Sequence, residues 1–451
     1  MVKMKLLCIV LIFAFTILSG AQNTHDPNYC YALDSLRPQQ QRWSDRTSNE
    51  NVRGSLAELQ VSSCTPARFW FYMRHADRLP SINDMNRMRP FSNEQTINII
   101  NAYIEGRSNL CHPDFNTINH WTFDPNITVE HEQFLTVSGW NIARNIASRY
   151  QAAFPTILPR TYDRNRFLFR YTDRQRTQAT LRAFADGLFG EGAYRNVFFP
   201  EPPFPDSLLR PHDNCPLYDD ASNTEVERDR WQNSAEFQAM LTRINDKLGL
   251  VDLQRLTARQ ARTMWELCQF HQLWEPHIQA PFCGAFSPYD NLRLEYFEDI
   301  DAYYTAGYGL NPVRLAENMN CPLMQDLLNF LTSNDPNEET VKIYSTHQTA
   351  FQLFLVSLGI FRDSVPITAD NFAEQANRLW ITSRMAPMAT NIAVIRYNCA
   401  TGGDDVQFIM NESPLVIPGC QSNGICKVSH IVDRYSRFIN ANCDILSCST
   451  N

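Results

Sequence analysis

A histidine set between two arginines is the part of this chain best suited to chemistry. Arg74, His75 and Arg78 follow Phe69–Met73, an unbroken apolar run, and Pro80 closes the segment. Such a run is typical of a buried strand, and proline cannot continue a central strand. In open α/β sheets, ligands bind beyond the carboxyl ends of the strands. Because guanidinium groups match phosphate oxygens, the loop is predicted to bind phosphate.

The full spacing Arg-His-x-x-Arg-x-Pro after an apolar strand is much rarer than an Arg-His pair, which is common on solvated loops. The spacing resembles the signature of the histidine acid phosphatases, which include phytases and multiple inositol polyphosphate phosphatases. The resemblance implies that His75 attacks phosphorus and becomes a phosphohistidine, while Arg74 and Arg78 hold the phosphate. It also implies an α/β fold with a central mixed sheet flanked by helices and an inserted, mostly helical domain. It implies no metal or other cofactor.

Two later segments also pass from a strand through a polar turn into a helix. Phe167–Tyr171 leads to Arg176 and Thr177, and Val341–Tyr344 leads to His347. By the resemblance, Arg176 is the third phosphate-binding arginine, and His347 is a catalytic residue that binds phosphate through its ring. Without the other motifs, Arg176 would equally suit a surface charge cluster, and His347 would suit helix capping or packing.

The residues after His347 depart from the family pattern. Most branches have Asp at the position of Gln348, and the inositol polyphosphate branch has Glu at the position of Thr349. Neither side chain donates a proton as a carboxylic acid does, and a positioned general acid contributes roughly 10²–10⁴-fold. Asp77 is the candidate substitute donor, since crowding against phosphate would raise its pKa. The alternative is that Asp77 points away and pairs with an arginine.

The resemblance implies an exported phosphomonoesterase for inositol polyphosphates such as phytate, slowed by the replaced acid. The first alternative is a catalytically impaired phosphate-binding protein on the same fold. The second is a structural secreted glycoprotein, which leaves the gathered phosphate ligands unexplained. The net charge of −8 argues against nucleic acid as a partner, although clustered arginines can still bind a small polyanion.

Residues 1–21 have the pattern of a secretory signal peptide. A start with Lys3 and Lys5 precedes the apolar run Leu6–Leu18, and the small residues Ser19-Gly20-Ala21 follow. The run is short for a bilayer span, so an uncleaved anchor is the weaker alternative. No later stretch is apolar enough to span a membrane. The chain is therefore predicted to be extracellular or in the lumen of the endoplasmic reticulum.

The length of 451 residues allows two domains, and 44% hydrophobic with 20% charged residues is ordinary for a folded protein. The family resemblance places a discontinuous α/β domain at 22–209 and 311–451, with the helical domain at 210–310. Residues 22–60 are polar and are expected to wrap the surface. A helix is predicted over 94–107, with its apolar face at Ile97, Ile100 and Ile104. Residues 108–135 are expected to be a long loop, and the histidine spacings within it match no common metal site.

The cysteines predict disulfide bonds. Twelve remain once Cys8 leaves with the signal, an even set in an exported chain. The short separations suggest three pairs, which are Cys268–Cys283, Cys420–Cys426 and Cys443–Cys448. The family resemblance implies a fourth pair, Cys64–Cys399. Two sequons, at Asn126 and Asn411, predict glycosylation in the same compartment.

Overall fold

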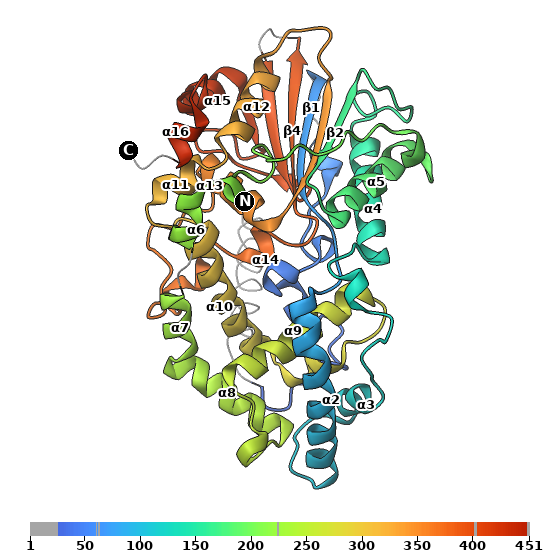
Figure 1. Cartoon of the computed structure of the whole chain (residues 1–451), viewed down its shortest axis with the longest axis vertical. Helices are drawn as coiled ribbons and strands as arrows, with labels where there is room; N and C mark the ends of the chain where they lie inside the picture. Colours follow the sequence, from blue (N-terminus) through green and yellow to red (C-terminus); the bar gives the residue numbers. More distant parts are fainter. Residues whose placement is uncertain (1–25, 60, 62–63, 223–224, 401–403, 449–451) are drawn as a thin grey trace, which may run out of the picture.

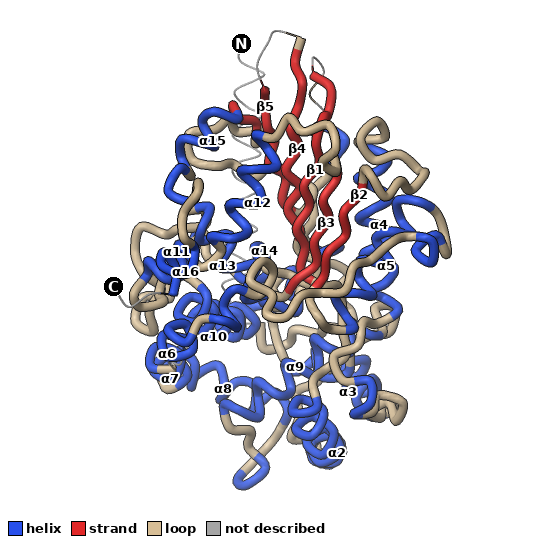
Figure 2. Tube along the Cα trace, turned by 45° about the horizontal axis from the view of Figure 1, so that its top comes forward, coloured by secondary structure: helices blue, strands red, loops and turns tan. Residues whose placement is uncertain are grey.

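The computed structural model describes residues 26–448 apart from 60, 62–63, 223–224 and 401–403, and the predicted signal peptide lies outside these residues. Within this part of the chain, seven strands form one mixed sheet with the order β2-β3-β1-β4-β5-β6, and β7 pairs with β5. Figure 2 shows the strands side by side above the larger group of helices. The strands are β1 (Cys64–Arg74), β2 (Phe167–Tyr171), β3 (Val341–Thr346), β4 (Asn391–Cys399), β5 (Asp404–Met410), β6 (Ser413–Pro414) and β7 (Ile425–Lys427).

The central strand β1 is buried on both faces, as its apolar run predicts. Phe69, Phe71 and Met73 join one hydrophobic core, while Trp70 and Tyr72 join the other. Alternate side chains of a strand point to opposite faces, so a continuous apolar run requires cover on both sides. Helices supply this cover on the two faces (Figure 1): α4 (Val137–Ala153) and α5 (Gln175–Phe189) on one, and α12 (Cys321–Thr332), α13 (Gln348–Leu358) and α15 (Val428–Arg434) on the other.

The register of the sheet aligns the ends of three strands. β1 pairs with β3 in parallel, with Arg74 opposite Thr346, and β2 pairs with β3 in parallel, with Tyr171 opposite Ser345. β4 runs antiparallel to β1, so it begins at this edge, with Asn391 opposite Met73. The loops after β1, β2 and β3 and the loop before β4 therefore meet at one edge of the sheet.

A helical region lies beyond that edge of the sheet (Figure 1). Helices α2 and α3 pack against helices of the predicted inserted segment, with α2 touching α8 and α9. The domain boundaries at 210 and 310 stay a prediction. The helices of this region and the remaining short helices are α2 (Ile82–Ile104), α3 (His112–Asn119), α6 (Pro216–Ser222), α7 (Val226–Gln232), α8 (Ala235–Leu248), α9 (Ala258–Trp274), α10 (Pro288–Ala306), α11 (Val313–Asn318), α14 (Thr382–Met385) and α16 (Cys443–Cys448).

The helix predicted over 94–107 has the wrong start and the wrong apolar face. It begins after Ser81, which caps it reciprocally with Asp84, and it runs to Ile104. Ile97 and Ile104 are exposed, at 60% and 74%, and the buried face is formed instead by Met85, Met88, Phe91, Ile99 and Ala102. The expected loop over 108–135 also contains a helix, α3.

The polar N-terminal segment is part of the interior as well as the surface. Tyr31, Trp43, Ser44, Thr47 and Asn49 are each at most 1% exposed. We call residues 38–52, which contain the short 3₁₀ helices Pro38–Gln41, Ser44–Arg46 and Asn49–Asn51, the N-terminal strap. The expectation that residues 22–60 simply wrap the surface is therefore wrong.

Three of the four predicted disulfides are confirmed, namely Cys64–Cys399, Cys268–Cys283 and Cys420–Cys426. The predicted pair Cys443–Cys448 is wrong. These two residues begin and end the helix α16, and residues five apart on a helix point in different directions. The remaining bonds are Cys321–Cys443, Cys215–Cys448 and Cys30–Cys111.

The two sequons lie in different surroundings. Asn126 is exposed in a turn, and its glycosylation stays a prediction. Asn411 is 5% exposed, and its side chain accepts from Asn49 and from the Asn391 N–H and donates to the Arg384 carbonyl. The burial of this amide argues against a glycan on the folded chain, and glycosylation at Asn411 stays a prediction. No helix in the described part of the chain is both long and apolar enough to cross a membrane.

Candidate active site

The loops at the aligned strand ends bring His75 and His347 together. The His75 N–H donates to the Thr346 carbonyl at 2.9 Å, and its own carbonyl accepts from the Ala389 N–H at 3.1 Å. These bonds fix the first loop between the ends of β3 and β4. The two imidazole centres lie 5.5 Å apart. The sheet thus unites segments that are 272 positions apart in the sequence.

The hydrogen bonds of His75 define which ring nitrogen is free. Nδ1 lies 3.0 Å from the Ala76 carbonyl oxygen, which can only accept, so Nδ1 carries the proton of the neutral ring. Nε2 then holds a lone pair. Burial, with the positive charges of Arg74 and Arg176, holds the pKa of His75 well below its ordinary value. His75 is therefore neutral at physiological pH and presents a nucleophilic nitrogen.

Arg74 is almost fully buried and tightly held, at 1% exposure. Its Nη1 donates to the carbonyl oxygens of Asp45 at 2.6 Å and Ala386 at 2.7 Å, and its Nη2 lies 3.2 Å from Asp45 Oδ2. Its Nε has no acceptor among the described residues. The guanidinium is thus oriented by the protein through Nη1 and Nη2, while Nε is a buried donor without a partner.

Arg78 and Arg176 form the least compensated part of the site. Arg78 lies over the Phe270 ring, 5.6 Å from its centre, and donates to the Leu79 carbonyl. Burial, followed by repulsion from Arg46 and Arg74, lowers the pKa of Arg78 to about 10. Burial and Arg78 lower the pKa of Arg176 to about 9. Cations that repel each other in a buried site favour the binding of an anion.

His347 is positioned by two neighbours from the β2–α5 turn. Its Nδ1 lies 3.1 Å from Nη2 of Arg176, which can only donate, so Nδ1 accepts and Nε2 carries the ring proton. Nε2 then donates to Thr172 Oγ1 at 2.8 Å. Burial and Arg176 hold the pKa of His347 well below its ordinary value. Both ring nitrogens therefore already have protein partners, and a phosphate oxygen bound by His347 would replace one of them.

The Asp77 side chain lies against α4. Ser138 Oγ donates to its Oδ2 at 3.3 Å, and its Oδ1 has no partner in the described structure. Burial raises the pKa of Asp77 to about 7, although Ser138 and Arg74 lower it. Gly139 permits this contact, because a Cβ there would lie 2.3 Å from the Asp77 carbonyl oxygen. Asp77 can hold a proton near neutral pH, and its hydrogen-bond partner is Ser138, not an arginine as in the alternative.

Several residues at the site were missed in the sequence. Asp45 and Arg46 of the N-terminal strap lie beside Arg74 and Arg78, and Arg46 also contacts the Phe270 ring. Arg210 and His212 lie near enough to His347 to lower its pKa. No apolar periodicity or strand-turn-helix pattern marks these residues, so no sequence signal identified them.

Possible metal ligands gather at three places in the described structure, all away from the strand-end loops. Each place contains a disulfide, whose sulfurs are not thiolates: Cys30–Cys111 with Asp114, Cys64–Cys399 with Asp405, and Cys420–Cys426 with His430. Such groups are poor metal sites, because thiolate is the form of cysteine that binds metals.

Comparisons with known proteins point to one family. The family described as histidine phosphatase superfamily (branch 2) matches residues 72–411. Multiple inositol polyphosphate phosphatase 1 of Drosophila melanogaster is 32% identical over 437 residues, covering 94% of this chain and 91% of that one. The protein of the same name from Homo sapiens is 24% identical over 424 residues, covering 87% and 82%.

Solved structures share the fold. The phytase from D. castellii aligns with a TM-score of 0.71 at 15% identity, covering 92% of this chain and 88% of that one. The Bifidobacterium longum multiple inositol polyphosphate phosphatase, in complex with inositol hexasulfate, aligns with a TM-score of 0.65 at 13% identity, covering 88% and 97%.

Proposed function

Because the chain belongs to branch 2 of the histidine phosphatase superfamily, we propose that it is a phosphomonoesterase acting through a phosphohistidine at His75. The observation that carries this proposal is the state of the His75 ring. Its Nδ1 proton is held by the Ala76 carbonyl, and its depressed pKa keeps Nε2 unprotonated beside three arginines. A buried imidazole with this tautomer is prepared to attack an electrophile that the arginines bind.

The chemistry assigned to the site is two successive displacements at phosphorus. The Nε2 lone pair of His75 forms a bond to phosphorus while the ester P–O bond breaks, and the leaving oxygen takes a proton. Water then attacks the phosphohistidine, which releases orthophosphate and restores the imidazole. Arg74, Arg78 and Arg176 are assigned to the non-bridging oxygens, where charge stabilisation governs phosphoryl transfer. We assign His347 to the same phosphate through its Nε2–H, with a phosphate oxygen replacing Thr172 Oγ1 as the acceptor.

The proposed substrates are inositol polyphosphates such as phytate. The related proteins from Drosophila melanogaster and Homo sapiens are named for inositol polyphosphates, and the structural neighbour from Bifidobacterium longum was solved with inositol hexasulfate. In this chain, Arg46 and Arg210 lie beside Arg78 and His347, where Arg46 is paired with Asp45 and Glu266 and Arg210 is paired with Asp213. A ligand with several phosphates would use these cations in addition to the three at the reacting phosphate.

The replaced acid favours slow turnover of alkyl phosphates, and an impaired phosphate-binding protein is the second candidate function. Gln348 and Thr349 begin α13, beside His347, and neither carries a carboxyl group. An inositol alkoxide is a poor leaving group, so loss of a general acid acts on this step far more than on phosphate binding. Asp77 stays the candidate donor, since the pKa of about 7 lets it hold a proton.

Trapping the phosphorylated enzyme tests the proposal. Wild type mixed with radiolabelled phytate or an aryl phosphate and quenched without acid should carry labelled phosphohistidine, and His75→Ala should carry none. His271→Gln is the matched control, because His271 is also buried but lies on α9 and packs against Trp121 and Trp274. Labelling that persists in His75→Ala would refute the assignment. Orthophosphate binding without any labelling of wild type would favour the impaired phosphate-binding protein.

We also propose that the protein travels the secretory route to the exterior or to the lumen of the endoplasmic reticulum. Six disulfides join its described cysteines, and such bonds persist in oxidising compartments. Mass spectrometry of the mature N-terminus tests the predicted cleavage after residue 21. A retained N-terminal segment would contradict it.

A further inference from the structure

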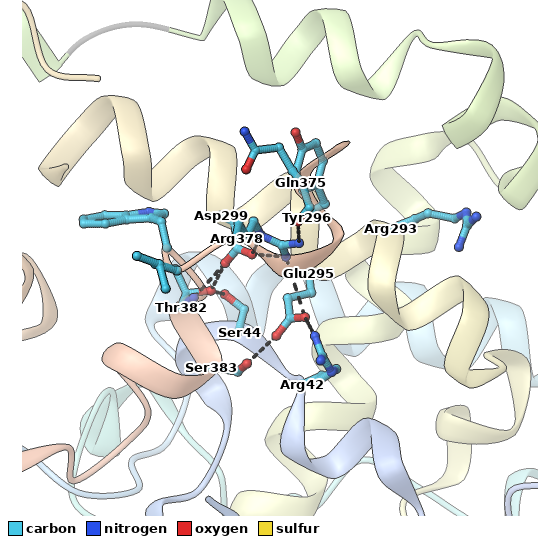
Figure 3. Close-up of polar contacts among 12 residues, drawn as sticks. Arg42, Ser44, Arg293, Glu295, Tyr296, Asp299, Gln375, Arg378, Thr382 and Ser383 are labelled. Atoms are coloured by element: carbon cyan, nitrogen blue, oxygen red, sulfur yellow. Dashed lines mark hydrogen bonds and ion pairs between the residues drawn. The ribbon is translucent and has the colours of Figure 1, made fainter. Parts of the chain in front are cut away.

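Two buried carboxylates lie one helical turn apart on α10, outside the phosphate-binding loops (Figure 3). Glu295 and Asp299 are both 0% exposed. Asp299 Oδ2 accepts from Nε of Arg378 at 2.9 Å and also from Nη2, which lies 3.8 Å from Glu295 Oε2. A buried carboxylate is costly unless it is paired and hydrogen-bonded, and Arg378 meets this need for both.

Together the two carboxylates bind two further chain segments: Glu295 contacts both the N-terminal strap and the short helix α14, and Asp299 contacts α14. Glu295 accepts from Nη1 of Arg42 in the strap at 3.0 Å and from the Ser383 hydroxyl in α14. Asp299 Oδ1 accepts from the N–H of Thr382 in α14 at 2.8 Å and from its hydroxyl at 2.5 Å. The two carboxylates therefore hold both segments against α10, as Figure 3 shows.

A hydroxyl pair joins the strap directly to α14. Ser44 Oγ lies 2.7 Å from Thr382 Oγ1, and both residues are at most 1% exposed. Since the Thr382 hydroxyl donates its proton to Asp299, its oxygen accepts from Ser44. The direction of donation thus runs from Ser44 to Thr382 to Asp299, and each link depends on the next.

The residues beside this hydroxyl pair hold Arg74. Asp45, which follows Ser44, accepts from Arg74 through its carbonyl and its carboxylate. Ala386, which follows α14, accepts through its carbonyl, and its own N–H donates to the Thr382 carbonyl at 2.9 Å. Arg74 therefore bridges the two segments that the hydroxyl pair joins, and a shift between them would move its acceptors apart.

The backbone of Ser44 supports a specific role for its side chain. Ser44 has φ 52°, in the left-handed region that glycine adopts without penalty and other residues adopt rarely. A buried non-glycine residue in this conformation persists only where surrounding contacts determine it, and such residues cluster at functional sites. Here the contact that a glycine would lose is the hydrogen bond to Thr382.

We propose that Ser44, Thr382 and Asp299 are positioning residues that set the placement of Arg74 in the phosphate site. The inference rests on the proposed function, because it takes Arg74 as a phosphate ligand. None of the three touches the reacting atoms. They act by fixing the Asp45 and Ala386 acceptors, and through them the orientation of the Arg74 guanidinium in the phosphate site.

Calorimetric titration with orthophosphate tests the inference, together with kcat and KM for an aryl phosphate and the melting temperature. Ser44→Gly removes the hydroxyl and relieves the backbone, so it should weaken orthophosphate binding about 5-fold, the effect of one lost hydrogen bond, without lowering the melting temperature. Thr382→Val removes both hydroxyl links and should weaken binding at least 10-fold. Thr263→Val is the matched control, since its buried hydroxyl donates only to the Arg259 carbonyl within α9.

A double-variant cycle separates positioning from general loss of stability. If Ser44 acts through Asp45, the double variant Ser44→Gly/Asp45→Asn should lose less affinity for orthophosphate than the product of the fold-losses in the two single variants. The inference would be overturned if the two losses of affinity simply multiply in the double variant. It would also be overturned if Ser44→Gly and Thr382→Val bind orthophosphate as tightly as wild type and Thr263→Val do. If Thr382→Val does not fold, Ser44→Gly alone decides. Failure of wild type to bind orthophosphate would instead overturn the proposed function, and the inference with it.

Discussion

Substitution of Asp77 by Asn gives a stability change whose sign and size follow from the structure. Asp77 is 1% exposed, and its Oδ1 has no partner among the described residues. Asn keeps the shape and can still accept from Ser138, but it cannot ionise. In wild type, burial raises the carboxyl pKa from 3.8 to about 7. The folded state therefore retains a proton that the unfolded chain has already lost.

The sign follows from proton linkage. Between pH 4 and pH 7 the folded state binds more protons at Asp77 than the unfolded state does, so the free energy of unfolding falls as pH rises through this window. Each pH unit between the two pKa values is worth about 1.36 kcal/mol, so ionising Asp77 inside the fold costs up to about 4 kcal/mol above pH 7. Asp77→Asn avoids this cost and should gain stability relative to wild type as pH rises.

Urea unfolding at pH 4.5, 6 and 7.5, with the disulfides intact, measures the effect. The difference in unfolding free energy between Asp77→Asn and wild type should move in favour of the variant by about 2–4 kcal/mol across this range. Asp84→Asn is a control whose difference from wild type should stay constant over this range, because the pKa of Asp84 lies below the range in both the folded and the unfolded state. Burial alone would raise the pKa of Asp84, but Arg46 and Ser81 lower it. A difference for Asp77→Asn that does not change with pH would refute a raised pKa and would remove Asp77 as a proton donor.

Two further variants probe the chemistry. Thr349→Glu, which restores the acid of the inositol polyphosphate branch, should accelerate phytate hydrolysis by about 10²-fold and affect an aryl ester much less. Equal acceleration of both esters would mean that proton donation is not what the chain lacks. Arg176→Ala should weaken competitive inhibition by orthophosphate or vanadate, since it removes an uncompensated guanidinium and frees His347 Nδ1. Unchanged inhibition constants would mean that the β2–α5 turn has no part in binding phosphate.

The parts of the fold that the sequence predicted are those with local patterns. The run Phe69–Met73 predicted a buried strand, and the segments around Arg176 and His347 each predicted a strand, a polar turn and a helix. The structure brings these residues together because β1, β2 and β3 are parallel neighbours. Short cysteine separations identified Cys268–Cys283 and Cys420–Cys426, but they failed at Cys443, whose partner Cys321 lies 122 residues away.

The parts that could not be predicted depend on contacts between distant segments. The sequence around Trp43 and Ser44 has no regular apolar spacing, because some residues of the strap face the core and their neighbours face the site. The partners of the strap lie on α10 and α14, more than 240 positions later in the chain. The buried face of α2 was likewise set by its packing against α9, which local spacing of isoleucines does not encode.

The charged groups of the site bear on phosphate binding, whereas the position of the replaced acid bears on turnover. Arg74 is paired with Asp45, whereas Arg78 and Arg176 have no carboxylate partner in the described part of the chain. Two uncompensated guanidinium groups match the charge of a phosphate ester, between about −1.5 and −2 at neutral pH. His75 and His347 add no charge, because burial and the arginines depress the pKa of each. None of these terms involves Gln348 or Thr349, so under the proposed function the replaced acid would leave phosphate binding in place and would act on protonation of the leaving oxygen.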